Sequence, residues 1–357
     1  MITTDMEKPL KFTIGNRDYY QAPSYDAVLS FVAQKERTSD LRTIPDFPLA
    51  LHVEVTSFCD NDCIFCARGD MKRENSHMDE TLFKKIIDEC AYQNCIGTLY
   101  LYHIGDPILN PKLPEYIRYA KEKKAAKNIA IATSANALTP ELSKKIIESG
   151  LDEISFSVDA LTYEKYRHIK GTENYARVLK NILDFVRIRE DLHHTNPRIT
   201  IKMLAIDEVI EDIDFFVRLW INIADQVLID REISSWDGTN KRTAELLKNM
   251  KCYTRKEGSI RYPCNRPWYW MAINAKGKVI LCSEDWDEKM IMGDVTKDSI
   301  YDIWHGDKYN FVKKCHIDAE WDKLPPCKSC DAHYERNIGN WFRENKEIAL
   351  KRNKHKE

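Results

Sequence analysis

The feature that most constrains the fold of this chain is an alternation of short apolar runs with longer amphipathic stretches, which begins near residue 50. The apolar runs have the length of β-strands, and the stretches between them place apolar residues at helical spacing. Six strand–helix units in series predict a parallel sheet with right-handed crossovers. The expected strands are 51–56, 97–104, 127–134, 151–159, 198–206 and 224–230, and the expected helices are 79–93, 112–124, 139–150, 175–191, 212–223 and 238–250.

Two folds fit such a series, an open doubly wound sheet and a curved, partial (β/α) barrel. In both folds the chemistry takes place at the carboxyl ends of the strands. Local signals support the helix boundaries. We expect Asp79 to cap one helix, and Pro140 and Gly150 lie in the first turn and just after the end of another.

The pattern changes after about residue 250. The segment 268–282 predicts a hairpin around Lys276 and Gly277, and two short helices are expected at 298–304 and 307–315. We therefore divide the chain into an N-terminal extension (1–48), a barrel domain (49–250), a small α+β domain (251–335) and a C-terminal helix or tail (336–357). The small domain has a poor prospect of a large apolar core, so we expect a metal centre to hold it together. Residues 1–48 lack a clear pattern apart from a helix expected near 24–36.

The bulk composition restricts the partners. The formal net charge of −2 gives no electrostatic case for nucleic acid as the main partner. No apolar run reaches the roughly 20 residues that a membrane span needs, and the first residues do not resemble a secretory signal. We therefore expect a cytoplasmic protein, in which eleven cysteines indicate metal or redox chemistry more than disulfides.

Three cysteines, Cys59, Cys63 and Cys66, follow the first expected strand with the spacing C-x3-C-x2-C. Thiolates favour zinc or an iron–sulfur cluster. A structural zinc site would need a fourth ligand from elsewhere in the chain. A four-iron cluster held by three cysteines instead leaves one iron open for a small molecule. The residues alone leave both readings open.

This group resembles the cluster loop of radical S-adenosylmethionine (SAM) enzymes, whose signature is C-x3-C-x-aromatic-C, with Phe65 as the aromatic residue here. Further matches follow in order, over roughly residues 50–340. "GDP" (105–107) resembles the family's glycine-acid-proline motif, "ATSAN" departs from the usual threonine-asparagine-glycine stretch, and "SFSVDA" and "YEKYR" resemble the fourth strand and the arginine segment after it. The resemblance implies a partial (β/α)6 TIM-like barrel.

The resemblance also implies residue roles. Cys59, Cys63 and Cys66 would hold a [4Fe–4S] cluster whose open iron binds SAM. The backbone near Gly105 and the Asp106 carboxylate, followed by Pro107, would receive the SAM ammonium, although Asp106 could simply shape a turn. Arg167, with Ser157 beside it, would meet the SAM carboxylate, and Phe65 would pack near adenine. Reductive cleavage of SAM would give a 5′-deoxyadenosyl radical, with a flavodoxin- or ferredoxin-type protein as electron donor.

A second cysteine set lies in the small domain and comprises Cys264, Cys282, Cys327 and Cys330. Four thiolates suit zinc or iron equally well. The layout resembles the SPASM and shorter twitch domains of the same superfamily, which implies one auxiliary [4Fe–4S] cluster. It is most similar to relatives that dehydrogenate or epimerise sugars and aminocyclitols. A fully ligated cluster can still accept an electron from a substrate radical.

Other residues are weaker candidates. Cys252 could donate a hydrogen atom to a substrate radical, as an epimerase requires, and His103 or Asp230, at expected strand ends facing the cavity, could be the base for an alcohol oxidation. Trp236 could pack against a sugar ring, and Cys315 is an alternative ligand of the second set. We expect Cys90 and Cys95 to be small buried hydrophobic residues.

The leading hypothesis is a radical SAM oxidoreductase that acts on a small polyhydroxylated or aminated substrate. The sequence does not separate dehydrogenation from epimerisation, because both begin with the same hydrogen abstraction. Two alternatives remain open. One is a maturase of a ribosomally made peptide, and the other is a zinc-stabilised binding module without catalysis.

Overall fold

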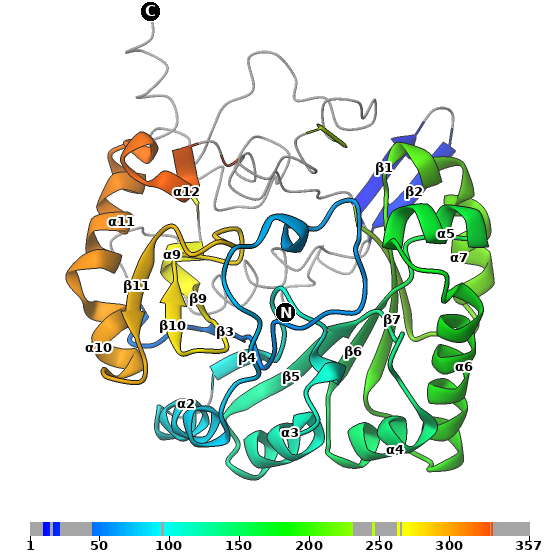
Figure 1. Cartoon of the computed structure of the whole chain (residues 1–357), viewed down its shortest axis with the longest axis horizontal. Coiled ribbons are helices and arrows are strands. Elements are labelled where there is room, and N and C mark those ends of the chain that lie inside the picture. The colour runs from blue at the N-terminus through cyan, green and yellow to red at the C-terminus, as the bar shows by residue number, and fades with distance from the viewer. Residues whose placement is uncertain are drawn as a thin grey trace, which may run out of the picture.

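Most of the strands in the described residues belong to one β-sheet. The computed structural model describes residues 10–14, 17–21, 45–93, 96–230, 245–246, 263–264, 266–328 and 330. Nine strands form one sheet in the order β11-β10-β9-β3-β4-β5-β6-β7-β8 (Figure 1). From β3 to β8 neighbouring strands are parallel and follow chain order: β3 Ala50–Val53, β4 Ile96–Tyr100, β5 Ala126–Thr133, β6 Glu153–Ser157, β7 Arg198–Leu204 and β8 Gln226–Asp230.

This strand order decides between the two folds. A doubly wound sheet reverses its strand order at a switch point, whereas here the six strands continue in one direction. Figure 1 shows the helices on the outer side of the curved sheet. They are α2 Glu80–Tyr92, α3 Leu113–Glu122, α4 Pro140–Glu148, α5 Tyr163–Lys170, α6 Tyr175–Asp191 and α7 Ile213–Trp220. The sheet does not close, so the predicted partial (β/α)6 barrel is confirmed.

The helix boundaries follow from local signals. Asp79 caps α2, where its carboxylate accepts hydrogen bonds from the backbone of Thr81 at 2.8 Å and of Leu82 at 3.3 Å. Pro140 is the first residue of α4, and Gly150 follows the end of that helix with a φ of +86°. The three positions act as the sequence predicts.

The two faces of the strands carry different side chains because successive residues of a strand point to opposite sides. The outer set is apolar and fully buried in the main core; it includes Leu51, Val53, Leu99, Ile129, Ile154, Phe156, Ile199 and Ile201. The alternating residues of β6 and β7 are polar and half-buried: Glu153, Ser155, Ser157, Thr200 and Lys202. The barrel therefore packs its helices with one face and leaves a polar inner face.

The C-terminal part continues the same sheet. β9 (Trp270–Ile273) pairs in parallel with β3, and β10 (Lys278–Ile280) and β11 (Ile291–Asp294) extend the sheet in antiparallel fashion. Gly277 has a φ of +82° in the β9–β10 connection, which confirms the predicted hairpin. The helices are α9 Arg266–Tyr269, α10 Ile300–His305, α11 Asp307–Ile317 and α12 Pro325–Lys328.

The expectation that this region lacks a substantial apolar core is wrong. Trp268, Trp304, Tyr309 and Trp321 are fully buried there, and most of its apolar residues join the same core cluster as the barrel. The physical reason is the pairing of β9 with β3, which lets the C-terminal region share the barrel's core.

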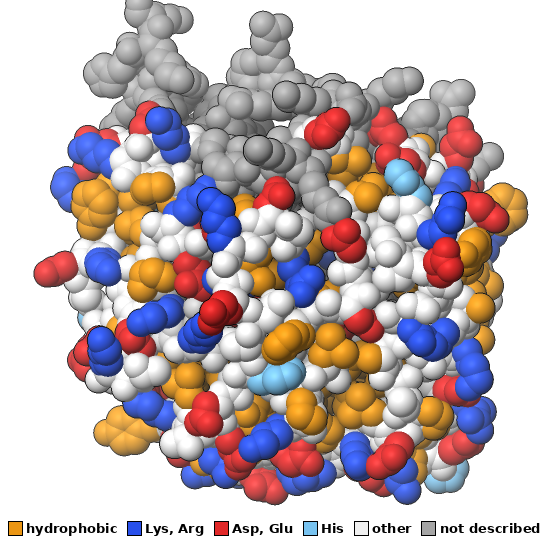
Figure 2. Space-filling view, viewed as in Figure 1, with side chains coloured by type: hydrophobic (Ala, Val, Ile, Leu, Met, Phe, Trp, Pro, Cys, Tyr) orange, Lys and Arg blue, Asp and Glu red, His pale blue; other side chains and the backbone are white. Residues whose placement is uncertain are grey.

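The N-terminal region contains structure that the sequence did not predict. β1 (Leu10–Ile14) and β2 (Arg17–Gln21) form an antiparallel hairpin, and β2 contacts β8. The helix expected near 24–36 lies outside the described residues, as does all but 245–246 of the helix expected at 238–250. In the described parts of the chain no helix is long and apolar enough to cross a membrane. Basic and acidic side chains are interspersed on the face in Figure 2, in keeping with the small net charge.

Candidate functional site

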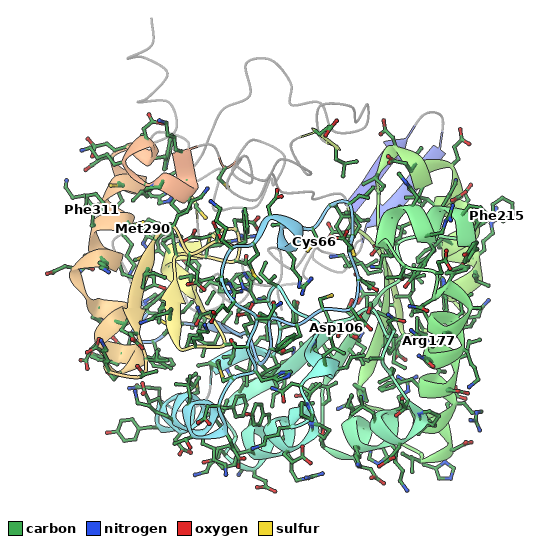
Figure 3. The ribbon with its side chains drawn as sticks, in the orientation of Figure 1. Cys66, Asp106, Arg177, Phe215, Met290 and Phe311 are labelled. Carbon is green, nitrogen blue, oxygen red and sulfur yellow. The ribbon has the colours of Figure 1, made fainter. Side chains whose placement is uncertain are left out.

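The loop with the first three cysteines leaves the carboxyl end of β3 and is fastened on both sides. The Ser57 backbone donates to the Ser76 carbonyl at 3.0 Å, and the Ser76 backbone donates to the Ser57 hydroxyl at 2.8 Å. At the far end Cys66 caps the short 3-10 helix η2 (Ala67–Asp70), and its sulfur accepts a hydrogen bond from the Arg68 backbone at 3.5 Å. The loop is thus held above the carboxyl ends of the strands, where Figure 3 labels Cys66.

The three thiols form one electrostatic group. Burial raises the pKa of Cys59 and of Cys63 to about 12, and it also raises the pKa of Cys66. Cys59 and Cys63 lie close enough for each charge to oppose the other, as do Cys66 and Cys59. The free thiols are therefore neutral, and metal binding must release their protons.

This donor set fits an iron–sulfur cluster, which thiolates hold. Within the described residues, no three His, Cys, Asp or Glu side chains converge as ligands of a single metal ion. A four-iron cluster binds each cysteine at a different iron, so its ligands need not meet at one point.

The carboxyl-terminal end of helix α5 is hydrogen-bonded to the cysteine loop. The backbones of Asp62 and Ile64 donate to the carbonyls of Lys170 and Ile169 at 3.0 and 2.9 Å. Gly171, at the end of α5, has a φ of +68°, and a Cβ there would lie 2.7 Å from the Asp62 carbonyl oxygen. A glycine is therefore required on both conformational and steric grounds.

A buried ion pair lies beside the same loop. The Lys170 ammonium is 2.7 Å from the Asp159 carboxylate, and the two side chains are only 3% and 2% exposed. The ammonium also lies 5.7 Å from the centre of the Phe65 ring. Although burial opposes its charge, the attraction of Asp159 and Cys63 raises the pKa of Lys170. A permanent positive charge thus adjoins the thiol group.

Gly105, Asp106 and Pro107 lie where β4 meets the cysteine loop. A Cβ at Gly105 would be 2.2 Å from the Thr56 carbonyl oxygen, so only glycine permits this approach. The Asp106 backbone donates to the Phe58 carbonyl at 2.8 Å. Pro107 begins a short 3-10 helix, η3 (Pro107–Leu109), which Asp106 caps. The two loops are therefore locked together by backbone contacts.

The Asp106 carboxylate is 4% exposed and already satisfied within the protein. It accepts hydrogen bonds from the Ser134 backbone at 2.9 Å, from the Ser134 hydroxyl at 2.7 Å and from the Ile108 backbone at 3.3 Å. The turn-shaping role that the sequence left open is thus realised, and the predicted contact with the SAM ammonium stays a prediction.

A series of hydrogen-bonded polar side chains lies near Asp106, and the sequence analysis did not predict it. The Asn136 amide donates to the Asp60 carboxylate at 2.8 Å, and the Arg177 guanidinium donates to the Asn136 carbonyl oxygen at 2.6 Å. Burial and the nearby Asp106 charge raise the pKa of Asp60. Figure 3 labels Cys66, Asp106 and Arg177 together. The sequence feature that could have pointed to this series is the stretch "ATSAN", whose last residue is Asn136.

Ser157 and Arg167, the other two residues predicted to contact the polar groups of SAM, differ in their surroundings. Ser157 is half-buried at the end of β6 and pairs across the sheet with Lys202. The Arg167 side chain is 61% exposed on α5 and lies 3.9 Å from Glu173. The structure therefore does not bring Arg167 into the group around Asp60, Asp106 and the cysteines.

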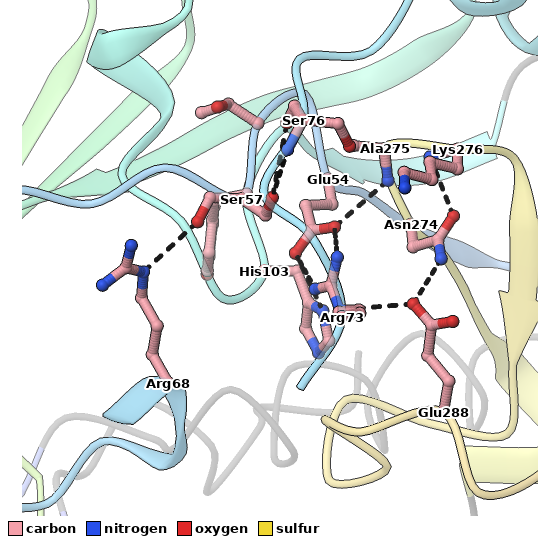
Figure 4. A network of polar contacts seen from close by, with 12 residues as sticks. Glu54, Ser57, Arg68, Arg73, Ser76, His103, Asn274, Ala275, Lys276 and Glu288 are labelled. Atoms are coloured by element: carbon pink, nitrogen blue, oxygen red, sulfur yellow. Dashed lines mark hydrogen bonds and ion pairs between the residues drawn. The ribbon is translucent and has the colours of Figure 1, made fainter. Parts of the chain in front are cut away.

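His103 belongs to a buried network that joins the barrel to the C-terminal region (Figure 4). Its ring lies 3.6 Å from the Glu54 carboxylate and 3.0 Å from the Ser283 carbonyl oxygen, next to Cys282. Glu54 also accepts two hydrogen bonds from Arg73, at 2.5 and 2.9 Å, and one from the Ala275 backbone at 3.1 Å. Although burial opposes ionisation, the nearby His103 ring and the Arg73 charge lower the pKa of Glu54 to about 2.

Asp230 lies on the inner face of the barrel. Its carboxylate is 2.6 Å from the Lys202 ammonium, with side-chain exposures of 21% and 31%. Despite its burial, the attraction of Asp230 raises the pKa of Lys202. Burial raises the pKa of the nearby Tyr102 to about 12, against the effect of Lys202. The His52 ring packs against Trp270 in a tilted arrangement, with ring centres 4.5 Å apart, and lies 5.2 Å from the ring centre of Tyr102.

The second cysteine set is brought together at one end of the C-terminal region. Cys264, Cys327 and Cys330 are buried, and Cys264 lies in the electrostatic field of Cys282 and Cys330. Burial raises the pKa of Cys264 well above its usual value and that of Cys282 to about 11, while Arg266 lowers both. These four soft donors fit the predicted auxiliary cluster.

His316 is a further residue that the sequence analysis did not single out. It is fully buried on α11, and its Nε2 lies 3.8 Å from the Cys327 sulfur. Cys90 and Cys315 both pack in the hydrophobic core, as predicted for Cys90. Cys95, Trp236 and Cys252 lie outside the described residues.

Two family models match the chain. Residues 53–218 match the radical SAM superfamily, and residues 264–331 match the SPASM iron–sulfur cluster-binding domain. The predicted cofactors follow from these two domains: a SAM-binding [4Fe–4S] cluster, an auxiliary iron–sulfur cluster and SAM.

Individual proteins are similar over most of the chain. The S-adenosyl-L-methionine-dependent 2-deoxy-scyllo-inosamine dehydrogenase of Niallia circulans is 21% identical over 282 residues, 79% of this chain and 92% of that protein.

Solved structures share the fold. BtrN in complex with AdoMet and 2-DOIA has a TM-score of 0.56 and 19% identity, covering 82% of this chain and 94% of its own. Streptococcus suis SuiB bound to the precursor peptide SuiA has a TM-score of 0.59 and 16% identity, covering 86% and 75%. The chain thus contains a radical SAM superfamily domain over residues 53–218 and a C-terminal iron–sulfur cluster-binding domain over residues 264–331.

Proposed function

We propose that this protein dehydrogenates a secondary alcohol of a small polyhydroxylated or amine-bearing substrate, such as an amino sugar or an aminocyclitol. When bound, the SAM-binding centre supplies hydrogen-atom abstraction and the auxiliary cluster supplies an acceptor for one electron. The observation that carries the proposal is the polar inner face, where Asp230 and Lys202 lie 2.6 Å apart. The similarity to an aminocyclitol dehydrogenase supports the same substrate class.

The residues near the cysteine loop are assigned to SAM. We assign the SAM ammonium to the backbone around Gly105 and to Asp106, with Pro107 fixing the turn, and adenine to the neighbourhood of Phe65. For the SAM carboxylate we replace Arg167 with Arg177. Both arginines are exposed, but the Arg177 guanidinium is anchored at 2.6 Å by Asn136, which is itself bonded to Asp60 of the cysteine loop. Ser157, the last residue of β6 and part of the polar inner face, is kept as a SAM contact.

The inner face is assigned to the substrate. A carbinol becomes a ketone when it loses a hydrogen atom from carbon, a proton from its hydroxyl group and one electron. Asp230 would take the proton, and Lys202 would hold the ionised carboxylate in position. Glu153 offers a second carboxylate on the same face, which suits a substrate ammonium or hydroxyl group. His103, already bonded to Ser283, is the weaker candidate for the base.

The test is an anaerobic assay of the reconstituted protein with SAM, a reductant and a panel of aminocyclitols, amino sugars and polyols. We expect a keto product from one class and 5′-deoxyadenosine in equal amount. A substrate deuterated at the carbinol carbon should transfer its deuterium to 5′-deoxyadenosine. Product formation without this transfer would refute the radical dehydrogenation.

A matched pair of variants tests the role of Asp230. Asp230→Asn should abolish the keto product while both clusters and the uncoupled cleavage of SAM are kept. Asp212→Asn is the control, because Asp212 also pairs with a lysine, Lys165, at 2.7 Å and with similar exposure, 16% and 34%. Equal turnover in the two variants would remove Asp230 from the mechanism.

Two alternatives have their own readouts. Epimerisation needs a hydrogen-atom donor, for which Cys252 is the candidate; Cys252→Ala would then lose the epimerised product and keep 5′-deoxyadenosine formation. A peptide substrate is the second alternative, since the fold is also similar to a structure bound to a precursor peptide. Turnover of a precursor peptide encoded nearby, with no small molecule accepted, would favour it.

The cellular context is part of the proposal. We place the protein in the cytoplasm and expect reduced flavodoxin or ferredoxin to replace the chemical reductant in the same assay. A flavodoxin-driven reaction that matches the chemical one would support this donor class, and failure of both protein donors would argue against it.

A further inference from the structure

The imidazole of His316 lies between two cysteines of the second set. Its Nδ1 lies 3.1 Å from the backbone nitrogen of Cys264 and 2.8 Å from the indole nitrogen of Trp321. Its Nε2 lies 3.8 Å from the sulfur of Cys327. The side chain is fully buried, so bulk water does not compete for these contacts.

These contacts fix the position of the ring proton. A backbone amide and an indole N–H can only donate hydrogen bonds, so Nδ1 must accept from both and carries no proton. A neutral imidazole then carries its proton on Nε2. That N–H points at the Cys327 sulfur within the longer range that sulfur acceptors allow.

We propose that His316 is a positioning residue that donates an Nε2–H hydrogen bond to the Cys327 thiolate and thereby raises the reduction potential of the auxiliary cluster. The inference rests on the assignment of Cys264 and Cys327 as ligands of that cluster. A hydrogen bond to a ligand sulfur stabilises the reduced, more negative state of an iron–sulfur cluster. His316 therefore makes the cluster a better electron acceptor, which is the part the proposed dehydrogenation requires of it.

His316 also fixes the backbone of the segment that carries Cys264, one of the expected cluster ligands. The contact from Nδ1 fixes the Cys264 backbone, and the Arg266 backbone donates to the Cys264 sulfur at 3.4 Å. A purely structural role would need only the Nδ1 contacts. The two roles can therefore be separated by side chains that keep one end of the imidazole and lose the other.

The test compares His316→Asn with His316→Gln in a protein whose first cluster is removed by Cys59→Ala, Cys63→Ala and Cys66→Ala. Asparagine places an acceptor near the Nδ1 position and keeps the contacts with Trp321 and Cys264, whereas glutamine places an N–H near the Nε2 position. An EPR-monitored redox titration then reports the midpoint potential of the auxiliary cluster alone. No substrate is present, so the result is independent of the proposed reaction.

We expect His316→Asn to make reduction about tenfold less favourable, a shift of about 59 mV to lower potential for one electron. His316→Gln should stay within about twofold of the parent. An unchanged potential in His316→Asn, or equal shifts in both variants, would overturn the hydrogen bond to sulfur.

A second measurement leaves His316 in place, in case the variants fail to hold the cluster. The parent protein, labelled with ¹⁵N-histidine, is reduced and studied by pulsed EPR in H₂O and D₂O. We expect a histidine ¹⁵N coupling together with an exchangeable proton coupling at the auxiliary cluster. The absence of both couplings would overturn the proposal whatever the variants do.

Discussion

Replacing Glu54 with glutamine should destabilise the protein although the new side chain has nearly the same shape. The Glu54 side chain is fully buried and joins Arg73, His103 and the backbone of Ala275, so it links β3 to the β9–β10 hairpin. Its pKa falls from 4.5 to about 2 on folding. That shift corresponds to about 3 kcal/mol of stability for the ionised form. Removing one partner of a buried ion pair costs a similar amount, about 3–5 kcal/mol.

The expected change in melting temperature follows from chain length. At roughly 2.1 cal/mol/K per residue, 357 residues give an unfolding entropy of about 0.75 kcal/mol/K, so 3 kcal/mol lowers Tm by about 4 °C. Circular dichroism of the cluster-loaded protein under anaerobic conditions measures this shift. The control is Glu80→Gln, because Glu80 pairs with Lys84 and Lys112 at the surface, is 41% exposed and should change Tm by less than about 1 °C.

The pH dependence of Glu54→Gln has a definite sign. A carboxyl group with a lowered pKa in the folded state contributes fully above its unfolded pKa and loses that contribution as the pH falls through the folded pKa. The Tm difference from the parent should thus be constant from pH 8 to pH 5 and should shrink only below about pH 4.5, towards the folded pKa of about 2. A Tm within 1 °C of the parent at pH 7, or a difference that already shrinks between pH 8 and pH 5, would refute the reasoning.

Three further outcomes follow from single contacts. Lys170→Met leaves Asp159 buried without its ion-pair partner, so stability should fall by about 3–5 kcal/mol in thermal unfolding; adding Asp159→Asn, which removes the charge but keeps an acceptor for the Leu204 backbone at a φ of +61°, should restore at least half, and no recovery would contradict a cost due to the lone charge. Gly105→Ala places a methyl 2.2 Å from the Thr56 carbonyl oxygen and should displace the cysteine loop, lowering bound iron from about eight to about four per chain with the auxiliary cluster kept; full iron content would contradict this. Cys282→Ala should lose the auxiliary irons yet still form 5′-deoxyadenosine without the keto product, and continued ketone formation would rule out that cluster as acceptor.

Much of the fold was predictable because one face of each barrel strand is apolar. Ile154 and Phe156 in β6, or Ile199 and Ile201 in β7, repeat at intervals of two and are all fully buried. The shared core of the C-terminal region was not predictable in the same way. It depends on the pairing of Leu51 with Met271 across 220 positions of sequence, for which no local pattern exists.

The candidate site likewise has a part that local sequence indicated and a part that only the tertiary structure brings together. Cys59, Cys63 and Cys66 lie within one loop, so their spacing indicated a metal centre, and the family resemblance implied a [4Fe–4S] cluster. The chain from Asp60 through Asn136 to Arg177 joins the loops after β3 and β5 to helix α6, and no local sequence pattern links these three segments. The family resemblance pointed to Arg167, on α5, but only the packing of α6 against the loop after β5 shows that Arg177 is held beside the cysteine loop.

The end of β4 explains how one chain can hold two centres in a fixed relation. Within four residues it supplies His103, bonded to the Ser283 carbonyl beside Cys282, and Gly105 and Asp106, packed against the loop of the first cysteines. A movement of the auxiliary site relative to the first centre must therefore break the buried contacts of His103 with Glu54 and Ser283. In the proposed reaction, electron transfer and hydrogen abstraction would both require fixed distances to one substrate, so the strength of this link would be part of the function. Glu54→Gln thus tests the coupling of the two centres as well as stability: if the link matters, the variant should form 5′-deoxyadenosine in excess over the keto product.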